Sequence, residues 1–287
     1  MKLTVKAPAK INLHLDILGR LNDGYHSLFM IMQTVSLFDI ITVEKGKKGI
    51  DITCSNPYVP PKEKNIAYKA AECFFKYINK ESCILINIEK NIPLQAGLAG
   101  GSADAAGVLV ALNRMFGECL NKKELCSLGL KIGSDVPFSI TGGTCISQNR
   151  GGILSPIKDL GDCFIILAKP EKGVSTKDAF EKADNCILFH PDNLKTLDFC
   201  EKGDFEGVFG EAANVFEQII EVPERVEIKR IMREYGCTFC RMTGSGPTVF
   251  GIFKDEDKSH QCCKALEELC PNVFVTKPIR HGATIIN

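Results

Sequence analysis

The chain has 287 residues, of which 45% are hydrophobic and 24% charged, with 25 Gly and 13 Pro. This composition excludes collagen-like, coiled-coil and disordered classes, and the length predicts about two domains. Lys and Arg total 35, as do Asp and Glu, so the zero formal charge gives no global attraction to nucleic acid or acidic membranes, although a local basic site for an anionic ligand stays possible.

The N-terminus reads MKLTVKAPAKINLHLDIL, and its regularly spaced polar residues leave no apolar core for a signal peptide. No apolar run approaches the ~20 residues that span a bilayer. We therefore expect a cytoplasmic protein with no membrane segment.

Residues 2 to 18 predict two strands separated by a break at Ala7-Pro8-Ala9. In the second strand apolar and polar residues alternate, which places one set on a core face and the other on the opposite face. The apolar set is Ile11, Leu13, Leu15 and Ile17, and the polar set is Lys10, Asn12, His14 and Asp16.

The rest of the first half alternates between strand and helix patterns. Residues 63 to 79 carry apolar positions at spacings of three and four, which predicts a helix. Strands are expected at 27–45 and 50–54, from Ile84, and near Thr144 and Ile153; further helices are expected at about 101–116 and 121–131.

The second half predicts the order strand, helices, strand, strand, helix, strand, which is typical of an α+β sandwich with antiparallel pairing. The change of character near residues 156 to 162 divides the chain into a first domain at 1–157 and a second at 158–287.

The fourteen cysteines lie mostly within apolar patterns, as in CILINI and CFIILA, which is typical of buried, reduced thiols. Cys237 and Cys240 form one CxxC, but no second regular pair completes a zinc site. Structural thiols are the favoured interpretation, with zinc as the alternative.

The segment Pro93 to Ala106, PLQAGLAGGSADAA, is the strongest chemical signal in the sequence. Its glycines let backbone N–H groups converge on an anion, and the following helix adds its positive end. GxxxxGK[ST] is absent and GLAGGS does not fit GxGxxG, so neither familiar nucleotide fingerprint applies. The segment predicts a phosphate site; the alternative is a tight turn with a serine cap.

Three other features are ambiguous when taken singly. Lys10 fits a solvated strand face as well as a catalytic role. Asp135, two residues before Pro137, fits a turn or a helix cap. The tract TGSGPT, residues 243–248, fits a hairpin turn as well as a loop close to a ligand.

Taken together, PAKINLHL, PLQAGLAGGSADAA, GSDVPF and MTGSGPTVF resemble the GHMP kinase superfamily over almost the whole chain, with its signature motifs at residues 8–15, 93–106 and 242–250. The resemblance implies an N-terminal α/β domain that carries an ATP-binding glycine-rich loop, a C-terminal ferredoxin-like α/β sandwich domain, and an active site between them.

Within the superfamily, KINLHLDILGRLNDGYHSL, KNIAYKAA and GSDVPFSITGGT resemble kinases that phosphorylate the 2-hydroxyl of a cytidine diphospho-sugar alcohol in the non-mevalonate route to isoprenoids. The implied cofactors are ATP and Mg²⁺, with metal ligands unassigned. The implied partner is this small molecule, with no nucleic acid or membrane, and we expect a monomer or weak homodimer.

The resemblance also implies roles for individual residues. Asp135 would accept the substrate hydroxyl proton, and Lys10 would stabilise charge on the transferred phosphoryl group. Asn12 would bind the substrate, Tyr25 and His26 would meet the cytosine with Phe180 stacked opposite, and Asn65 would lie near the adenosine. The loop around the ATP phosphates would comprise Leu94, Gln95, Ala96, Gly97, Leu98, Ala99, Gly100, Gly101, Ser102, Ala103 and Asp104.

The glycine loop departs from the commoner GLGGGSSNAA at two places. Ala99 replaces a glycine, which is acceptable if its φ is negative. Ala103-Asp104 replaces Ser-Asn, and the added carboxylate would favour the helix dipole or help hold magnesium.

Other interpretations remain open from the sequence. The chain could be another kinase of the superfamily, acting on mevalonate derivatives, homoserine or a sugar. It could also be a catalytically silent sugar- or nucleotide-binding protein, or carry a phosphate-binding turn with no catalysis.

Overall fold

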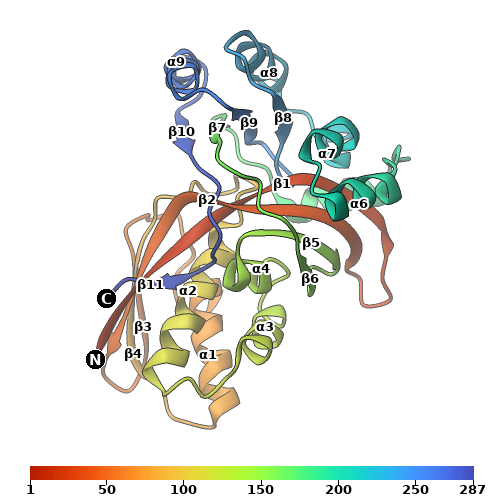
Figure 1. Ribbon diagram of the computed structural model, residues 1–287. Coiled ribbons are helices and arrows are strands. Elements are labelled where there is room, and N and C mark those ends of the chain that lie inside the picture. Colours follow the sequence, from red (N-terminus) through yellow and green to blue (C-terminus); the bar gives the residue numbers. More distant parts are fainter.

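The chain is organised around two β-sheets, which Figure 1 shows one above the other; the computed structural model describes residues 1–287. The first sheet has seven strands in the order β11-β1-β2-β4-β3, with β5 paired to β2 and β6 to β5. Its strands are β1 (Lys2–Arg20), β2 (His26–Lys45), β3 (Gly49–Cys54), β4 (Cys83–Glu89), β5 (Thr144–Asn149), β6 (Ile153–Pro156) and β11 (Thr284–Ile285).

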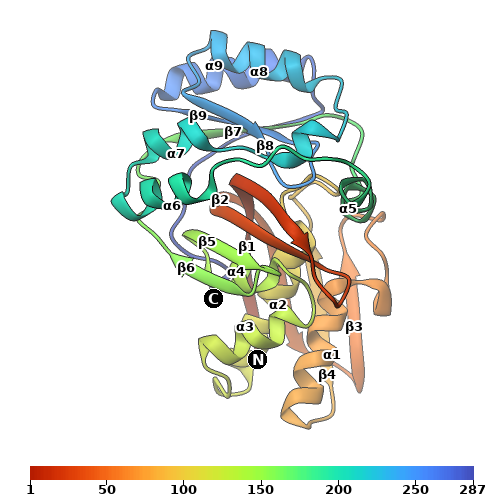
Figure 2. The ribbon, with the colours of Figure 1, turned by 90° about the vertical axis from the view of Figure 1, so that its right-hand side faces the viewer.

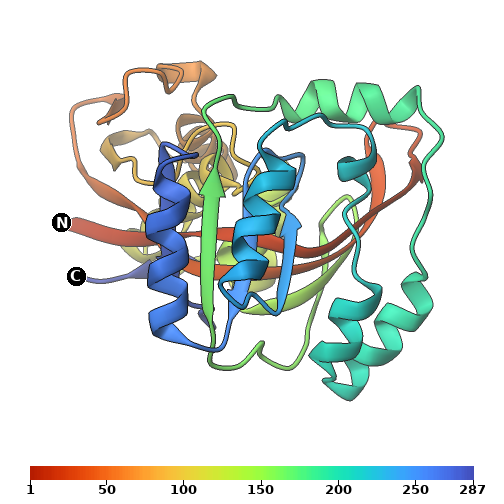
Figure 3. The same cartoon turned by 90° about the horizontal axis from the view of Figure 1, so that it is seen from above.

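The second sheet has four antiparallel strands in the order β10-β7-β9-β8. They are β7 (Phe164–Lys169), β8 (Phe239–Met242), β9 (Val249–Phe253) and β10 (Asn272–Thr276). Two helices, α8 (Arg225–Glu234) and α9 (Glu256–Glu267), cover one face of this sheet, as seen from above in Figure 3. The α+β sandwich and the order of its elements are as predicted.

A long antiparallel hairpin of β1 and β2 crosses the molecule between the two halves (Figure 1). Ile11 and Leu13 of β1 belong to the same buried cluster as Ile165 and Phe250 of the second sheet, so one core serves both halves. Toward its turn the hairpin packs against α5 (Thr176–Asp184), which lies beside that end in Figure 2.

The predicted break at Ala7-Pro8-Ala9 is wrong, because β1 is continuous from Lys2 to Arg20. Its pairing with β2 shifts register between Pro8 and Lys10, where Ala9 alone lies opposite the three β2 residues 35–37, and a bulge in β2 accommodates the extra residues without ending β1. Proline is tolerated here because β11 pairs with β1 only at Val5 and Lys6, so the edge at Pro8 has no neighbouring strand.

Beyond Pro8, backbone and side-chain oxygens from three loops take the place of that missing strand. The amide of Lys10 donates to Leu98 O at 3.1 Å. The backbone amide of Asn12 donates to Thr243 Oγ1 at 2.9 Å. The backbone amide of Leu15 donates to a carbonyl oxygen of the third loop, that of Ala213. The edge of β1 therefore sets where the glycine-rich segments of both halves lie.

The polar residues of β1 do not form a solvated face, because all four are buried. Asn193 at the start of α6 (Asn193–Lys202) binds two of them, with 2.8 Å from His14 Nε2 to Asn193 Oδ1 and 2.6 Å from Asn193 Nδ2 to Asp16 Oδ2. Burial lowers the pKa of His14. This face of the strand docks the helical segment of the second half.

The predicted helices of the first half are present and lie on one face of its sheet (Figure 1). A short α4 (Val136–Thr141) was not predicted, because six residues are too few for a helical period to show in the sequence. Pro137 near its start fits a helix N-terminus. The remaining helical segments are η1 (Lys62–Lys64), α1 (Ile66–Ile78), α2 (Gly100–Met115), α3 (Lys122–Leu130), α7 (Phe205–Glu211) and η2 (Val215–Gln218).

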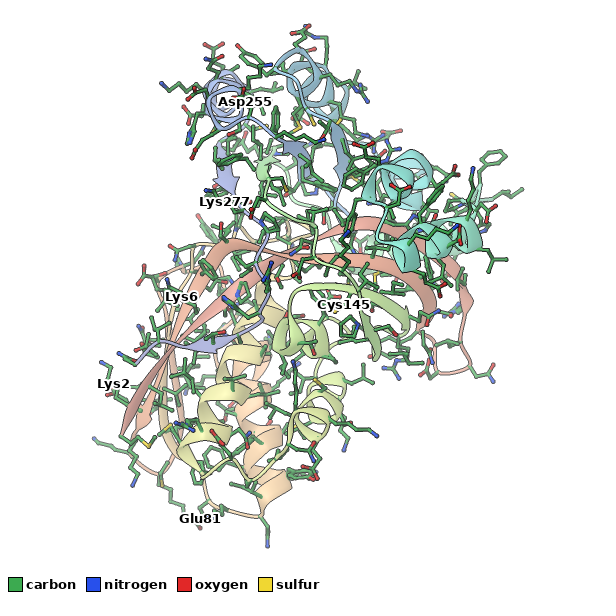
Figure 4. All side chains as sticks on the ribbon, viewed as in Figure 1. Lys2, Lys6, Glu81, Cys145, Asp255 and Lys277 are labelled. Atoms are coloured by element: carbon green, nitrogen blue, oxygen red, sulfur yellow. The ribbon has the colours of Figure 1, made fainter.

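The C-terminal segment returns to the first sheet. From Lys277, labelled in Figure 4, the chain passes beside β2, where the Ser36 amide donates to Lys277 O at 2.9 Å. It then adds β11 to β1. The predicted division between residues 157 and 158 falls in the connection from β6 to β7, but the last strand pairs with the N-terminal half.

None of the helices combines the length and the apolar character that a membrane span requires. All fourteen cysteines are free thiols, and six of them are buried. Nowhere in residues 1–287 do three His, Cys, Asp or Glu side chains lie together in a group that could hold a metal ion.

Ala99 contradicts the expectation of a negative φ at this position. It precedes α2 as its N-cap residue with φ 57° and ψ 30°, in the left-handed region. That conformation costs an L-residue about 1–2 kcal/mol relative to right-handed backbone. The backbone at Ala99 therefore has a conformation that suits glycine, and the methyl group of Ala99 makes that conformation strained.

A buried ion cluster holds the start of α2 against the sheet. The Lys90 ammonium, which follows β4, contacts Asp39 of β2 and Asp104 of α2, at 2.7 Å from Asp104 Oδ2. Asp39 also accepts the amides of Asn91 and Ile92 at 2.6 and 2.8 Å. Asp104 Oδ1 has no partner.

One ammonium cannot fully compensate two buried carboxylates. Burial raises the pKa of Asp104 well above its usual range, and Asp39 raises it further, against the lowering effect of Lys90. Burial alone would lower the pKa of Lys90, but Asp104 and Asp39 outweigh it and raise the pKa. The cluster is thus held together by Lys90, with Asp104 as its strained member.

We predict that Asp104→Asn changes the pH dependence of stability. A raised pKa means that folded Asp104 binds a proton more tightly than unfolded Asp104, so its contribution is favourable below about pH 4 and is lost as the pH rises toward the folded value. In that window the free energy of unfolding of the wild type falls by about 1.4 kcal/mol per pH unit. That of Asp104→Asn does not fall in this way, because the amide does not titrate. Urea unfolding of both proteins between pH 4 and pH 8 measures the difference.

The advantage of Asp104→Asn over wild type should grow with pH. As a control, Lys90→Met leaves two uncompensated carboxylates and should cost about 3–5 kcal/mol at neutral pH. A constant difference between wild type and Asp104→Asn over this range would show that Asp104 is not the strained carboxylate.

Candidate active site

A cavity of about 670 Å³ lies where β1, the glycine loop, α5 and the TGSGP loop meet. Its lining includes most of the residues predicted for the site. These are Lys10, Asn12, Tyr25, His26, Leu94, Gln95, Ala96, Gly97, Leu98, Ala99, Gly100, Gly101, Ser102, Asp135 and Phe180. Asn65, Ala103 and Asp104 are not in the lining.

The glycine loop is shaped by what packs beneath it. Gly97 has φ +73°, and a Cβ there would lie 2.2 Å from Thr243 O, so only glycine permits this contact. A Cβ at Gly100 would lie 3.0 Å from Ile92 Cγ2 and from Lys90 Nζ. These close contacts leave no room for a side chain at Gly97 or Gly100, while Ser102 of the same loop lines the cavity.

The loop leads directly into α2, whose 16 residues start at Gly100. The first amides of a helix lack internal partners and carry partial positive charge. Since Gly100, Gly101 and Ser102 line the cavity, this end can bind an anion such as a phosphate group.

Lys10 reaches the same cavity from β1 and is only 5% exposed. Its Nζ donates to Asn12 Oδ1 at 2.8 Å and to Gly97 O at 3.1 Å. Its third neighbour is Asp135 Oδ2 at 3.7 Å. The ammonium is therefore held between the glycine loop and a carboxylate, although 125 residues separate Lys10 from Asp135.

Asp135 occupies the N-cap position of α4, yet its side chain makes no capping hydrogen bond. Its side chain is 28% exposed and lies on the cavity lining. The backbone position fits the expectation of a cap residue, but the carboxylate is free to meet a ligand. The turn before α4 positions this group.

Asn12 is anchored at both ends of its carboxamide. Oδ1 accepts from Lys10, and Nδ2 lies 3.3 Å from Met30 Sδ. This fixes the amide beside the Lys10–Asp135 pair.

The far end of the cavity is aromatic. His26 stacks on Phe180 with ring centroids 4.6 Å apart and an interplanar angle of 20°. Its Nε2 lies 2.7 Å from Asp184 Oδ1. In this structure His26, rather than open space, occupies one face of Phe180, so a base stacked on Phe180 requires His26 to move aside or the base to take another face.

Arg150 was missed by sequence reasoning. Its guanidinium carbon lies 3.6 Å from the centroid of Tyr25, and it pairs with Asp23 at 2.7 Å. Its Nε is buried without a partner, and the residue lines the cavity. The only signal is NRGG, a lone Arg in a turn between two predicted strands, which is too common to single out.

Asp184, Thr176 and Ser245 also line the cavity; Asp184 and Thr176 were not predicted, whereas Ser245 belongs to the TGSGPT tract, for which a loop close to a ligand was one of the two interpretations. Thr176 Oγ1 and Ser245 Oγ are 3.1 Å apart, which joins α5 to the TGSGP loop. Nothing in the sequence places these residues together, because 69 positions separate them.

Two predicted site residues have other contacts. Asn65 is buried as the N-cap of α1, where its Oδ1 accepts the Ala67 amide at 2.8 Å; its neighbour Ile66 lines the cavity instead. Asp104 is not in the lining; its carboxylate binds Lys90, whose own side chain does line the cavity.

Family models match both halves of the chain. The GHMP kinases N terminal domain matches residues 65–143, and the GHMP kinases C terminal domain matches residues 198–272.

Curated relatives match over nearly the full length. One from Clostridium botulinum (strain Alaska E43 / Type E3) is 42% identical over 280 residues, which is 96% of this chain and 100% of the relative. One from Bacillus cereus (strain B4264) is 41% identical over 288 residues, which is 99% and 100%. Both are named 4-diphosphocytidyl-2-C-methyl-D-erythritol kinase.

Solved structures agree. A 4-(cytidine 5'-diphospho)-2C-methyl-D-erythritol kinase has a TM-score of 0.74 at 28% identity and covers 97% of this chain and 99% of its own. The homoserine kinase from Cytophaga hutchinsonii has a TM-score of 0.79 at 18% identity, covering 99% and 97%, and shares the fold. The chain therefore belongs to the GHMP kinase family, in the group whose curated relatives are named 4-diphosphocytidyl-2-C-methyl-D-erythritol kinase.

Proposed function

We propose that this chain is an ATP-dependent kinase that phosphorylates the 2-hydroxyl of 4-diphosphocytidyl-2-C-methyl-D-erythritol. One observation carries the proposal: a single cavity joins a glycine loop at a helix N-terminus, a lysine–carboxylate pair and an aromatic end. These three parts match a triphosphate, a reacting hydroxyl and a base. The name of relatives at 41–42% identity supplies the substrate.

The glycine loop is the proposed site of the ATP phosphates. The amides at the start of α2 and the Ser102 hydroxyl would donate to phosphate oxygens, and the helix end adds its positive field. Asn65 remains the proposed neighbour of the adenosine. Because its side chain caps α1, it would act by holding Ile66 at the cavity.

The Lys10–Asp135 pair is the proposed site of phosphoryl transfer. The oxygen of the substrate 2-hydroxyl bonds to the γ-phosphorus while the bond from that phosphorus to the β–γ bridging oxygen breaks, and ADP leaves. Asp135 accepts the hydroxyl proton. Lys10, fixed by Asn12 and Gly97, stabilises the charge that develops on the transferred group.

The aromatic end is the proposed site of the cytosine, with Tyr25, His26 and Phe180 as its walls. Arg150 lies above Tyr25 and lines the same space. Its cation and its unpartnered Nε suit the diphosphate of the substrate.

Magnesium is proposed to accompany ATP, where it neutralises phosphate charge. Mg²⁺ keeps several waters and binds through one or two side chains plus substrate phosphates, which fits a lining that offers the Ser102 hydroxyl and the Asp135 carboxylate, the latter 3.7 Å from Lys10 Nζ. Asp104 is already bound to Lys90 and buried beneath the loop, so it is not among the proposed ligands.

Kinases for homoserine and mevalonate share this fold at 16–18% identity, which supports the fold alone. The aromatic end favours a base-containing substrate over theirs. A silent binding protein would have no need of the Lys10–Asp135 pair. Cytoplasmic location and a monomer or weak homodimer remain predictions from the sequence.

The function is tested by incubating the purified chain with ATP, Mg²⁺ and 4-diphosphocytidyl-2-C-methyl-D-erythritol. Mass spectrometry should show a product heavier by one phosphoryl group, with ADP formed in equal amount. Turnover of homoserine or mevalonate in preference to this substrate would contradict the proposal.

We predict that Asp135→Asn lowers kcat about 10²–10⁴-fold, the usual range for losing a general acid–base group, with little change in KM. Lys10→Met should cost a comparable factor through lost charge stabilisation. The double variant should be little worse than either, because the two residues act as a unit. Steady-state kinetics with saturating ATP measures all three.

The matched control is Asp51→Asn, an exposed carboxylate on β3, which should behave as wild type. If Asp135→Asn kept more than about a tenth of wild-type kcat, outside that range for a general base, Asp135 would have only its backbone role at the start of α4.

We also predict that His26→Ala lowers kcat/KM for the cytidine substrate about tenfold or more, while any basal ATP hydrolysis is kept. The reason is that an unpaired buried polar group costs about 1–3 kcal/mol. For the same reason the wild type should discriminate at least about tenfold against the uridine analogue. His260→Ala on α9 is the matched control. Equal use of the two nucleotide substrates would remove Tyr25 and His26 from the proposed site.

A further inference from the structure

Thr243 lies where the two glycine-rich loops touch, and it is fully buried. Its hydroxyl oxygen accepts a hydrogen bond from the backbone N–H of Asn12 at 2.9 Å. The same oxygen lies 3.4 Å from Gly97 O and 3.5 Å from Asn12 Oδ1, the two acceptors available to its proton. The side chain therefore bridges β1 and the glycine loop from the second half of the chain.

These two acceptors are the ones that hold Lys10. Lys10 Nζ donates to Asn12 Oδ1 at 2.8 Å and to Gly97 O at 3.1 Å, which uses two of its three N–H groups. The third can point toward Asp135 and the reacting group. Thr243 thus contacts both anchors of the ammonium without lining the cavity itself.

The loop that carries Thr243 is itself well fixed. The Thr243 amide donates to Thr248 O at 2.9 Å. Asn214 Nδ2 donates to Met242 O at 2.7 Å and to Gly244 O at 2.8 Å, on either side of Thr243. A hydroxyl on a rigid loop can hold its neighbours in place, whereas one on a mobile loop would follow them.

We propose that Thr243 is a positioning residue for phosphoryl transfer: its hydroxyl fixes Asn12 and the Gly97 carbonyl, and through them aims the Lys10 ammonium. The C-terminal half thereby sets the geometry of a catalytic pair that belongs to the N-terminal half. This inference rests on the proposed roles of Lys10 and Asp135.

The same loop provides a matched control. Thr248 is also fully buried, but its Oγ1 has no hydrogen-bond partner. Replacing either threonine by valine keeps the shape and removes the hydroxyl. If hydroxyl loss acts only through packing, the two substitutions have the same effect on catalysis.

The test compares Thr243→Val, Thr243→Ser and Thr248→Val in the assay described above, after wild-type turnover has established the proposed function. We expect Thr243→Val to lower kcat about ten- to a hundredfold, since a misplacement near 1 Å can cost about 10²-fold, with a smaller change in KM for ATP. Thr243→Ser, which keeps the hydroxyl, and Thr248→Val should both stay close to wild type. Thermal unfolding confirms that each variant is folded.

A double variant separates positioning from general damage. If Thr243 acts through Lys10, Thr243→Val should lower kcat little further in the Lys10→Met background. An equal loss in both backgrounds would overturn the inference. So would wild-type kcat in Thr243→Val, or a loss in Thr243→Ser as large as in Thr243→Val.

Discussion

The close contact between Gly97 and Thr243 is the constraint on which the site depends. It brings the loop before α2 against the loop between β8 and β9, and a single added Cβ at Gly97 would prevent it. Around this contact the chain gathers Lys10, Asn12 and the Gly97 carbonyl within hydrogen-bond distance. The glycine loop and Lys10, the proposed catalytic lysine, therefore share one anchor, so neither can shift without the other.

The long strand β1 makes this arrangement possible. Its edge has no partner strand beyond Lys6, and the free amides of Lys10, Asn12 and Leu15 are satisfied by loops from both halves. Because a buried backbone N–H without an acceptor is costly, these hydrogen bonds fix the positions of the loops along the strand. Because β1 continues past the register shift at Pro8, where the sequence pattern suggested a break, one strand serves the sheet at one end and the cavity at the other.

The glycine loop shows how a local departure in sequence is absorbed. Ala99 keeps a left-handed backbone that its methyl group disfavours, because the loop is held by Gly97 on one side and by α2 on the other. Asp104 adds a second carboxylate beside Lys90, and burial raises its pKa. Both departures thus act on the protein itself, Ala99 through its backbone and Asp104 through its contact with Lys90.

Hydrophobic periodicity determined the element order and the α+β class, and the resemblance of four motifs in order along the chain indicated the family, because these are properties of short stretches of chain and of their order. The sequence also singled out Lys10, Asp135 and the glycine loop. It did not determine that β1 is continuous, that β11 returns to β1, or that Arg150 and Thr176 join the cavity. Those features depend on contacts between residues far apart in the chain. Whether Asp104 meets a ligand or a buried lysine is likewise decided only when β2, the segment after β4 and α2 pack together, because the same carboxylate has a different chemistry in water and in the core.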